Sequence, residues 1–395
     1  NMLATDVDFG YDGSVYVSDW VNSWEGVGKG RLYRVTHESA ARNRQIERVQ
    51  RLLVEGGFDQ MRDFEVIELL AHPDQRLRLR AQFAVADKGR RGIPTFARIL
   101  EASRSRFARL HAVWGLGQIG RTLPEAFSPV LRQLSDDDAV LRAQAAKVLG
   151  DARYAVAARP LTALLKDEDA HVRAMAAIAL GKLGKPTAID PLLTMLADNA
   201  GSDPWLRHAG SYGLSLIGDG DALAAAADHE HPSARMGVLL AMRHLRDPRV
   251  ATFLNDAEPR LVVEAARAIN DLTLDEAMPK LAALLDTTQS KDGPLIRRVI
   301  NANLRVGGAD RAAAVAAFAA RKDADTTLRT EALGALAAWT KPDELDRVTN
   351  LWRPVDPAER PADEVVAAIE AHLGSVLVAS EPESVRTAAV ALIGQ

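Results

Sequence analysis

A pattern of small apolar residues at helical spacing recurs along most of the chain. It is clearest in DDDAVLRAQAAKVLG (Asp136–Gly150) and DEDAHVRAMAAIALG (Asp167–Gly181), where an acidic start and an arginine precede the apolar positions. Residues three, four and seven after the arginine, such as Ala145, Ala146 and Leu149, fall on one face of a helix. The pattern predicts amphipathic helices that bury a stripe of small side chains.

The copies of this pattern form a repeat when they are aligned on the arginine. The alignment places the following residues at equivalent positions: Arg80, Arg109, Arg142, Arg173, Arg207, Arg235, Val263 in place of an arginine, Arg297, Arg329 and Arg386. Most steps are 28 to 34 residues long, and a first apolar helix and a polar turn precede each motif helix. Two helices per unit at this period are typical of an α-solenoid. We predict an all-α superhelix of antiparallel helix pairs over residues 61–395, with about nine to ten units. The step from Arg329 to Arg386 is 57 residues, which predicts one irregular unit between them.

An aspartate stands four residues before several of these arginines. The pairs are Asp138 and Arg142, Asp169 and Arg173, Asp203 and Arg207, and Asp325 and Arg329. A short acceptor at this place is typical of a helix N-cap, which satisfies free backbone N–H groups. The arginine one turn later could then bond the cap of its own or of the next repeat. We interpret the series as a structural ladder rather than an anion-binding row, because it recurs in nearly every unit.

Composition limits the chemistry of the chain. Its 395 residues are 47% hydrophobic and only 5% aromatic, which suits closely packed short helices. The absence of cysteine excludes disulfides, thiolate zinc sites, thiol nucleophiles and CxxCH haem attachment from this sequence. No apolar run of about 18 residues occurs, so we expect no membrane span.

One basic stretch departs from the weak net charge of −4. Between Arg76 and Arg109, ten lysines and arginines accompany only two acids, Asp87 and Glu101. This first repeat supports an alternative function, a solenoid of the DNA-repair type that binds nucleic acid through salt-sensitive phosphate contacts. The repeats from Asp136 onward are acidic or neutral, and no basic and aromatic residues interleave there. We therefore place nucleic acid second to a protein partner.

The first 60 residues do not follow the repeat. Residues 1–36 contain the strand-like segments ATDVDF, SVYVSDW and RLYRVT, and Tyr11-Asp12-Gly13 indicates a hairpin turn. Three short strands cannot bury a core alone, so they either pack on the solenoid or complete a larger β-structure. Residues 37–60 predict a linker helix, whose arginines form a solvated face (Arg42, Arg44, Arg48 and Arg51).

These residues carry a resemblance to a known family. Asp6–Trp20 with Gly28–Val35 resembles the last β-propeller blade of bacterial sorbosone/glucose-dehydrogenase-like proteins. Ala71–Gly89 resembles the first HEAT unit after the propeller in "membrane-bound dehydrogenase" proteins of the planctomycete haem-binding type. The resemblance implies a HEAT-repeat solenoid, an extracytoplasmic location and a larger parent protein of which this chain is a piece. The sequence lacks the other blades and any CxxCH, so no catalytic or haem-binding residue is carried over.

Catalytic signatures are matched only in part. GVGKG (Gly26–Gly30) lacks the earlier glycine and the final Ser or Thr of a phosphate-binding loop. His229-Glu230-His231 separates its histidines by two positions and precedes Pro232, which favours a turn over a metal site. GSYG (Gly210–Gly213) lacks the spacing of a nucleophile elbow. We predict no catalytic, cofactor-binding or metal-binding residue in this chain.

A candidate binding surface follows from the geometry of the repeat. The position five after each arginine should point away from the core, toward the inner surface of the solenoid. This inner row consists of Val85, Trp114, Lys147, Ile178, Tyr212 and Leu240, and it is flanked by His111, Gln144, Met175 and His208. Large apolar residues on an exposed row indicate a docking site for a protein partner or for the missing domains of the parent protein. The alternative is that neighbouring helices cover them. We predict a non-catalytic interaction scaffold.

Overall fold

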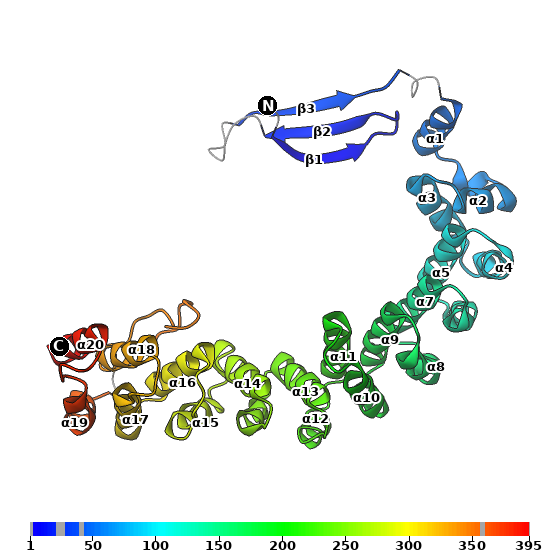
Figure 1. Ribbon diagram of the computed structural model, residues 1–395. Coiled ribbons are helices and arrows are strands. Elements are labelled where there is room, and N and C mark those ends of the chain that lie inside the picture. The colour runs from blue at the N-terminus through cyan, green and yellow to red at the C-terminus, as the bar shows by residue number, and fades with distance from the viewer. Residues whose placement is uncertain (1–2, 21–27, 39–42, 356–359, 395) are drawn as a thin grey trace. The chain divides into compact units, whose positions relative to one another are not determined.

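The computed structural model describes residues 3–20, 28–38, 43–355 and 360–394 (Figure 1). Arg42 and the first two residues of the GVGKG segment lie outside this part. The chain divides into two compact units, residues 1–179 and residues 180–395, each of which is described by itself. The prediction of a helical solenoid preceded by a short β-segment is confirmed.

The first unit begins with an antiparallel sheet in the order β1 (Ala4–Phe9), β2 (Val15–Trp20) and β3 (Gly30–Val35). Val7, Phe9 and Val35 lie on one face of this sheet and are 61%, 67% and 56% exposed. The end of β1 is tied to the helices, because Arg76 donates to the carbonyls of Phe9 and Gly10 at 2.9 and 3.1 Å. The sheet is therefore anchored at its hairpin, while an apolar face remains exposed.

Helix pairs make up the rest of the first unit. Helix α1 (Arg44–Glu55) lies in the predicted linker. The pairs that follow are α2 (Asp63–Leu70) with α3 (Gln75–Ala86), α4 (Ile93–Ala102) with α5 (Arg106–Gly120), α6 (Phe127–Arg132) with α7 (Ala139–Asp151), and α8 (Ala158–Ala163) with α9 (Ala170–Leu183). The last residues of α9 belong to the second unit. The second helices α3, α5 and α7 lie side by side and form one layer (Figure 1).

The second unit continues the same arrangement. Its pairs are α10 (Ile189–Asn199) with α11 (Pro204–Ile217), α12 (Gly220–Ala225) with α13 (Pro232–Leu245), the 3-10 helix Pro248–Asn255 with α14 (Pro259–Asp271), α15 (Met278–Ala283) with α16 (Gly293–Val306), α17 (Ala309–Ala320) with α18 (Thr326–Ala337), and α19 (Ala362–His372) with α20 (Glu383–Ile393). Helices α11, α13, α14, α16, α18 and α20 pack in succession.

Glycine and alanine allow these second helices to approach closely. A Cβ atom added to Gly150 of α7 would lie 2.6 Å from the Cα of Ala179 in α9. One added to Gly181 would lie 2.6 Å from the Cα of Gly213 in α11. Real Cβ atoms do not approach other atoms so closely, so a larger residue would force the helix backbones apart. The alanine-rich pattern of the sequence thus sets the spacing between helices.

The arginine register begins at a different residue from the predicted one. Arg142 stands four residues after Asp138, the N-cap of α7. The N-cap of α3 is Asp74, so the equivalent residue is Arg78 and not Arg80. The sequence LRLRA satisfies the pattern in either register, because arginines alternate with leucines there. Burial decides between them, since Arg78 is 8% exposed and Arg80 is exposed.

Two later units carry no register arginine at all. Their second helices begin after the caps Glu258 and Asp292. The residues four positions later are Val262, not the predicted Val263, and Ile296, not the predicted Arg297. The ladder is therefore interrupted in α14 and α16.

The prediction of an irregular repeat unit between Arg329 and Arg386 is also wrong. Within the described residues, α19 and α20 form the last pair, and the segment between α18 and α19 holds only an isolated bridge between Leu345 and Trp352. The prolines of this stretch remove backbone donors, so it crosses the second helices without becoming helical.

Asp346 fastens this non-helical segment to the second unit. Its side chain is fully buried and accepts hydrogen bonds from the backbone N–H groups of Val348 and Thr349 at 3.0 and 2.8 Å. Nδ2 of Asn301 in α16 donates to the same carboxylate at 2.9 Å, and two half-buried arginines lie within 3.6 Å of it (Arg305 and Arg353). Burial opposes ionisation of Asp346, but these hydrogen bonds and the Arg353 charge outweigh it and lower its pKa.

Candidate functional site

Arg142 and Arg235 are held by acceptors from two successive turns, whereas Arg173 bonds the carbonyls of its own turn, those of Asp167 and Glu168. Nη1 of Arg142 donates to the carbonyls of Asp136 and Asp137 at 2.8 and 3.2 Å. Its Nε and Nη2 each lie 2.8 Å from a carboxylate oxygen of Asp167, in the turn of the next helix pair. The same ion pair joins Arg109 to Asp136 and Arg235 to Asp256. Each such pair links two repeats through a nearly buried contact.

The predicted caps lie where the sequence placed them, but they do not receive the ladder arginines. Asp138, Asp169, Asp203 and Asp325 each accept the backbone N–H two residues later, at 2.8 to 2.9 Å. Arg142 instead bonds Asp167, two residues before the cap Asp169, and Asp167 also accepts the N–H of Asp169 at 2.9 Å. Arg235 likewise bonds Asp256, two residues before the cap Glu258, so the expectation that the ladder arginine bonds a cap is wrong.

In the first unit, part of the inner row is buried. Val85 is 1% exposed because of the shifted register, and the residue five after Arg78 is Phe83, which is 39% exposed. His111 is 4% exposed, and its ring nitrogens bond Gln82 at 2.7 Å and Arg78 at 3.2 Å. Burial, with the charge of Arg78, lowers the pKa of His111 to about 4. Val85 and His111 therefore belong to the core and not to a contact surface.

The other predicted residues of the first unit lie at the surface of α5, α7 and α9. Trp114 is half-buried and donates from Nε1 to Gln144 at 3.0 Å. Lys147 is exposed and pairs with Asp151 one turn later at 2.7 Å. The remaining two, Met175 and Ile178, are half-buried on α9. Their side chains form a row that is partly satisfied by contacts along and between the helices.

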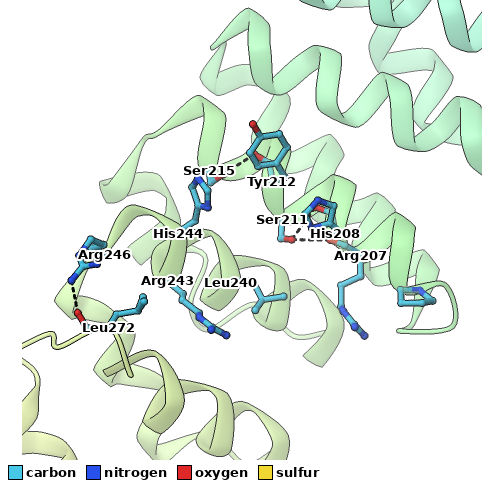
Figure 2. Close-up of a pocket in the computed structure, with 11 residues that line it drawn as sticks. Arg207, His208, Ser211, Tyr212, Ser215, Leu240, Arg243, His244, Arg246 and Leu272 are labelled. Atoms are coloured by element: carbon cyan, nitrogen blue, oxygen red, sulfur yellow. Dashed lines mark hydrogen bonds between the residues drawn. The ribbon is translucent and has the colours of Figure 1, made fainter. Parts of the chain in front are cut away.

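In the second unit, three predicted residues meet in one groove of about 470 Å³ (Figure 2). His208 and Tyr212 come from α11 and Leu240 from α13, and the ladder residue Arg207 also lines the groove. The remaining lining residues are Pro204, Ser211, Ser215, Arg243, His244, Arg246 and Leu272. We call this surface the basic groove.

Aromatic rings form one side of the basic groove. His208 and Tyr212, one helical turn apart, stack with centroids 5.9 Å apart and planes 5° apart. His244 of α13 meets Tyr212 edge-on at 5.7 Å and 80°. The two histidines are exposed and the tyrosine is half-buried, so flat rings are presented to a ligand.

Guanidinium groups supply the charge of the basic groove. Nη1 of Arg243 lies 3.3 Å from Glu264, and Arg246 donates to the carbonyl of Leu272. Arg207 makes no side-chain hydrogen bond or ion pair with any described residue. Three cations thus surround a groove whose own lining contains no acid.

The sequence reasoning missed Arg243, His244 and Arg246. That reasoning considered the position five after each arginine and the residues that flank it. Arg243, His244 and Arg246 lie further along, near the end of α13. Their signal is the basic cluster RHLR in the last turn of the helix, a place that the helix dipole favours for cations. Only the packing of α13 against α11 places this cluster beside Tyr212.

A second cavity of about 1070 Å³ adjoins the basic groove and shares Arg207 and Leu240 with it. Apolar side chains from α13 and α14 line it, including Met236, Val262 and Val263. Its lining also contains the carboxylates of Asp256, Glu258, Glu264 and Asp292. The two cavities together form a continuous surface, basic and aromatic at one end and apolar and acidic at the other.

Half of the cations in the basic first repeat are paired with carboxylates. Five of its ten cations form ion pairs: Arg76 with Asp74, Lys88 with Asp63, Arg90 with Glu125, Arg106 with Asp138 and Arg109 with Asp136. Arg78 is buried against His111. The pairs of Arg90, Arg106 and Arg109 join neighbouring repeats, so part of the basic cluster has a structural role.

Among the described residues, no group of three or more His, Asp or Glu side chains is placed to hold a metal ion. His229 accepts the N–H of His231, which caps α13, so this segment is the predicted inter-helix turn. Ser211 donates to the carbonyls of Arg207 and His208 and has no general base beside it. None of the described helices is long and apolar enough to cross a bilayer.

Stacked helix pairs joined by an Asp–Arg ladder define an α-solenoid of the HEAT type. Residues 127–215, from α6 to α11, match the family model of HEAT repeats. A search of curated proteins finds no match.

Similar solved structures include importin β, with 11% identity and a TM-score of 0.45 over 77% of this chain and 50% of that chain. The CpcE–CpcF complex of phycocyanin lyase from a Nostoc species has 21% identity and a TM-score of 0.32, covering 71% of this chain and 94% of that chain. Human deoxyhypusine hydroxylase has 20% identity and a TM-score of 0.27, covering 65% and 97%. Likeness at this level says nothing about the activity of this chain.

Proposed function

We propose that this protein is a non-catalytic interaction scaffold that docks a peptide segment of a protein partner in the second unit. The observation that carries the proposal is the pair of adjoining cavities around Arg207 and Leu240. Together they offer flat aromatic rings, guanidinium groups and an apolar pocket, the combination that anchors peptide segments at protein interfaces. The described residues of the groove contain no nucleophile with a base beside it.

The repeat architecture supports a docking role. Within each unit, the second helices of successive described pairs pack side by side, so they form a surface that spans several repeats. An extended peptide can contact several repeats at once on such a surface. The buried ladder pairs keep neighbouring helices in register, which reduces the ordering that the scaffold must undergo on binding.

Residues 6–35 resemble a terminal β-propeller blade, and this resemblance supports a second part of the proposal, which concerns the parent protein. We place the chain in a larger extracytoplasmic, dehydrogenase-like haem protein, where the solenoid docks the other domains or their partners. The exposed apolar face of the β1–β3 sheet supports this view, because such a face is normally covered by another β-sheet. The intact mass and visible spectrum of the native gene product test it. A mass near 42.7 kDa without haem absorption would refute this part.

Peptide selection on the purified chain tests the docking site. Extended peptides from a random display library should include binders, and their affinity should fall at least about tenfold in Tyr212→Ala and in Leu240→Asp. Val156→Ala is the matched control, because Val156 is an apolar residue 63% exposed in the first unit. Circular dichroism verifies that each variant is folded. Selected peptides that bind both groove variants as tightly as the wild type would show that docking occurs elsewhere.

A further inference from the structure

The Asp–Arg ladder lacks its next-turn carboxylate at Arg173 and at Arg207, and Arg207 of the basic groove also lacks the bonds to its own turn that Arg173 keeps. In Arg142 and Arg235, Nη1 donates to the carbonyls six and five residues earlier, and Nε and Nη2 bond a carboxylate in the next turn. For Arg207, the position of that next carboxylate is occupied by His229. His229 preserves the local turn, because its Nδ1 accepts the N–H of the cap His231 at 3.0 Å, as Asp167 does for its own cap. It supplies no negative charge to the preceding arginine.

The side chain of Arg207 also makes no hydrogen bond to the carbonyls of the turn that precedes α11. The carbonyls six and five residues earlier belong to Gly201 and Ser202, in the lengthened turn between α10 and α11. Ala200 and Gly201 have positive φ angles there (46° and 75°), and no bond from Arg207 to these carbonyls forms. Arg207 thus retains its charge and all its guanidinium donors, whereas Arg142 and Arg235 use theirs between repeats.

The other cations of the groove are incompletely compensated. Arg243 shares Glu264 with Arg267, each at 3.3 Å, and Arg246 donates to a neutral carbonyl. Figure 2 shows Arg207 and Arg243 extending to the same side, with Leu240 between them. Three guanidinium groups with one shared carboxylate favour an anionic ligand, and planar guanidinium groups bind carboxylates in a bidentate way.

We propose that the basic groove binds the carboxylates of an acidic peptide, with Arg207 as the anchor that the ladder releases. This inference rests on the proposed function and names the chemistry of the docked segment. Charge complementarity selects a peptide over a nucleic acid, because the adjoining cavity presents Glu258 and Asp292. Those carboxylates would repel a continuous polyanion, whereas apolar residues of a peptide can follow its acidic residues into the apolar pocket.

Fluorescence anisotropy with three defined probes tests the chemistry. The first probe is a short peptide with a glutamate-rich half followed by leucines, the second has glutamine in place of every glutamate, and the third is a single-stranded oligonucleotide of the same net charge. The acidic peptide should bind about tenfold or more tightly than the glutamine peptide and the oligonucleotide, and its affinity should fall as salt is raised.

Two variants test the role of Arg207. Arg207→Gln removes the anchor, and His229→Asp restores the missing ladder carboxylate although His229 does not line either cavity. Each should weaken acidic-peptide binding about tenfold and leave the glutamine peptide unaffected. His229→Asn and Arg159→Gln are matched controls that should bind as the wild type does, since the first adds no charge and the second removes an exposed arginine elsewhere.

The outcomes separate this inference from the proposed function. Equal binding of the acidic and glutamine peptides, or wild-type affinity in both Arg207→Gln and His229→Asp, overturns the inference. If Leu240→Asp still weakens peptide binding in that case, the docking function survives with another ligand chemistry. Tighter binding of the oligonucleotide than of the acidic peptide overturns the inference in favour of nucleic acid. Failure of both peptides to bind overturns it as well.

Discussion

The strongest test of the fold is removal of one ladder arginine. The side chains of Arg142 and Asp167 are 9% and 8% exposed, and two 2.8 Å hydrogen bonds join them. Arg142→Ala leaves that carboxylate nearly buried without its partner, and it also leaves the carbonyls of Asp136 and Asp137 without their donor. Removing one partner of such a pair costs about 3–5 kcal/mol in the free energy of unfolding.

A double-mutant cycle distinguishes this ladder from helix capping. Asp169→Ala removes the acceptor for the N–H groups of His171 and Val172 and should cost only ~1 kcal/mol. Arg142→Ala should couple to Asp167→Ala by about 1–3 kcal/mol, because the double variant leaves no buried charge unpaired. It should not couple to Asp169→Ala. Urea unfolding followed by far-UV circular dichroism gives each free energy.

Two results would refute this reasoning. The first is a loss below ~1 kcal/mol for Arg142→Ala, which would show that the pair behaves as an exposed one. The second is a larger coupling of Arg142 to Asp169 than to Asp167. That result would show that Arg142 interacts with the N-cap Asp169, as the sequence alone suggested, rather than with Asp167.

Two further predictions concern the second unit and the packing of small residues. Asp346→Asn leaves Arg305 and Arg353 without their carboxylate and should cost about 3–5 kcal/mol at pH 7 in urea unfolding, whereas the exposed Asp343→Asn should cost little. Because the pKa of Asp346 is lowered by folding, its contribution is present above the unfolded pKa of about 4 and is lost as the pH falls through the folded pKa. The difference between wild type and Asp346→Asn should therefore shrink below about pH 4, and a difference that stays constant to pH 2 would contradict the ionised pair. Gly150→Ala should lower stability by about 1–3 kcal/mol, because the new Cβ would meet the backbone of α9 at Ala179. The control Gly374→Ala places its Cβ in open space, and equal melting temperatures of the two variants would contradict the close approach.

The gap in the ladder gives a physical reason for a binding site within a regular repeat. An arginine whose donors are all bonded to its own and the next repeat has none left for a ligand carboxylate. Exchange of one carboxylate for His229 leaves the fold intact, since the turn and its cap are preserved. Because position 229 carries no carboxylate, the guanidinium donors of Arg207 are available to a ligand in the groove. Specificity can thus arise from a residue that does not touch the ligand.

The sequence by itself determined the class of fold and the N-terminal ends of four helices, those capped by Asp138, Asp169, Asp203 and Asp325. Helix periodicity, small apolar residues and N-caps act within about one turn, so they are readable from residues close together in the chain. That is why the caps at Asp138 and Asp325 and the three strands lie where the pattern placed them. The same local reasoning placed Tyr212 and Leu240 on exposed helix faces, where the groove contains them, but it assigned Arg207 to the structural ladder.

Tertiary structure decided which side chains meet. Two arginines in LRLRA fit the repeat equally well, and only burial against the next helix selects Arg78 over Arg80. The ladder bond of Arg142 goes to Asp167, which lies 25 residues away in the next turn, and no local pattern specifies that distance. The groove needs α13 to pack beside α11, because its cations and its aromatic rings come from different helices. Contacts between repeats depend on helix spacing and on the length of each turn, and these are set by packing across the whole layer rather than by any one segment.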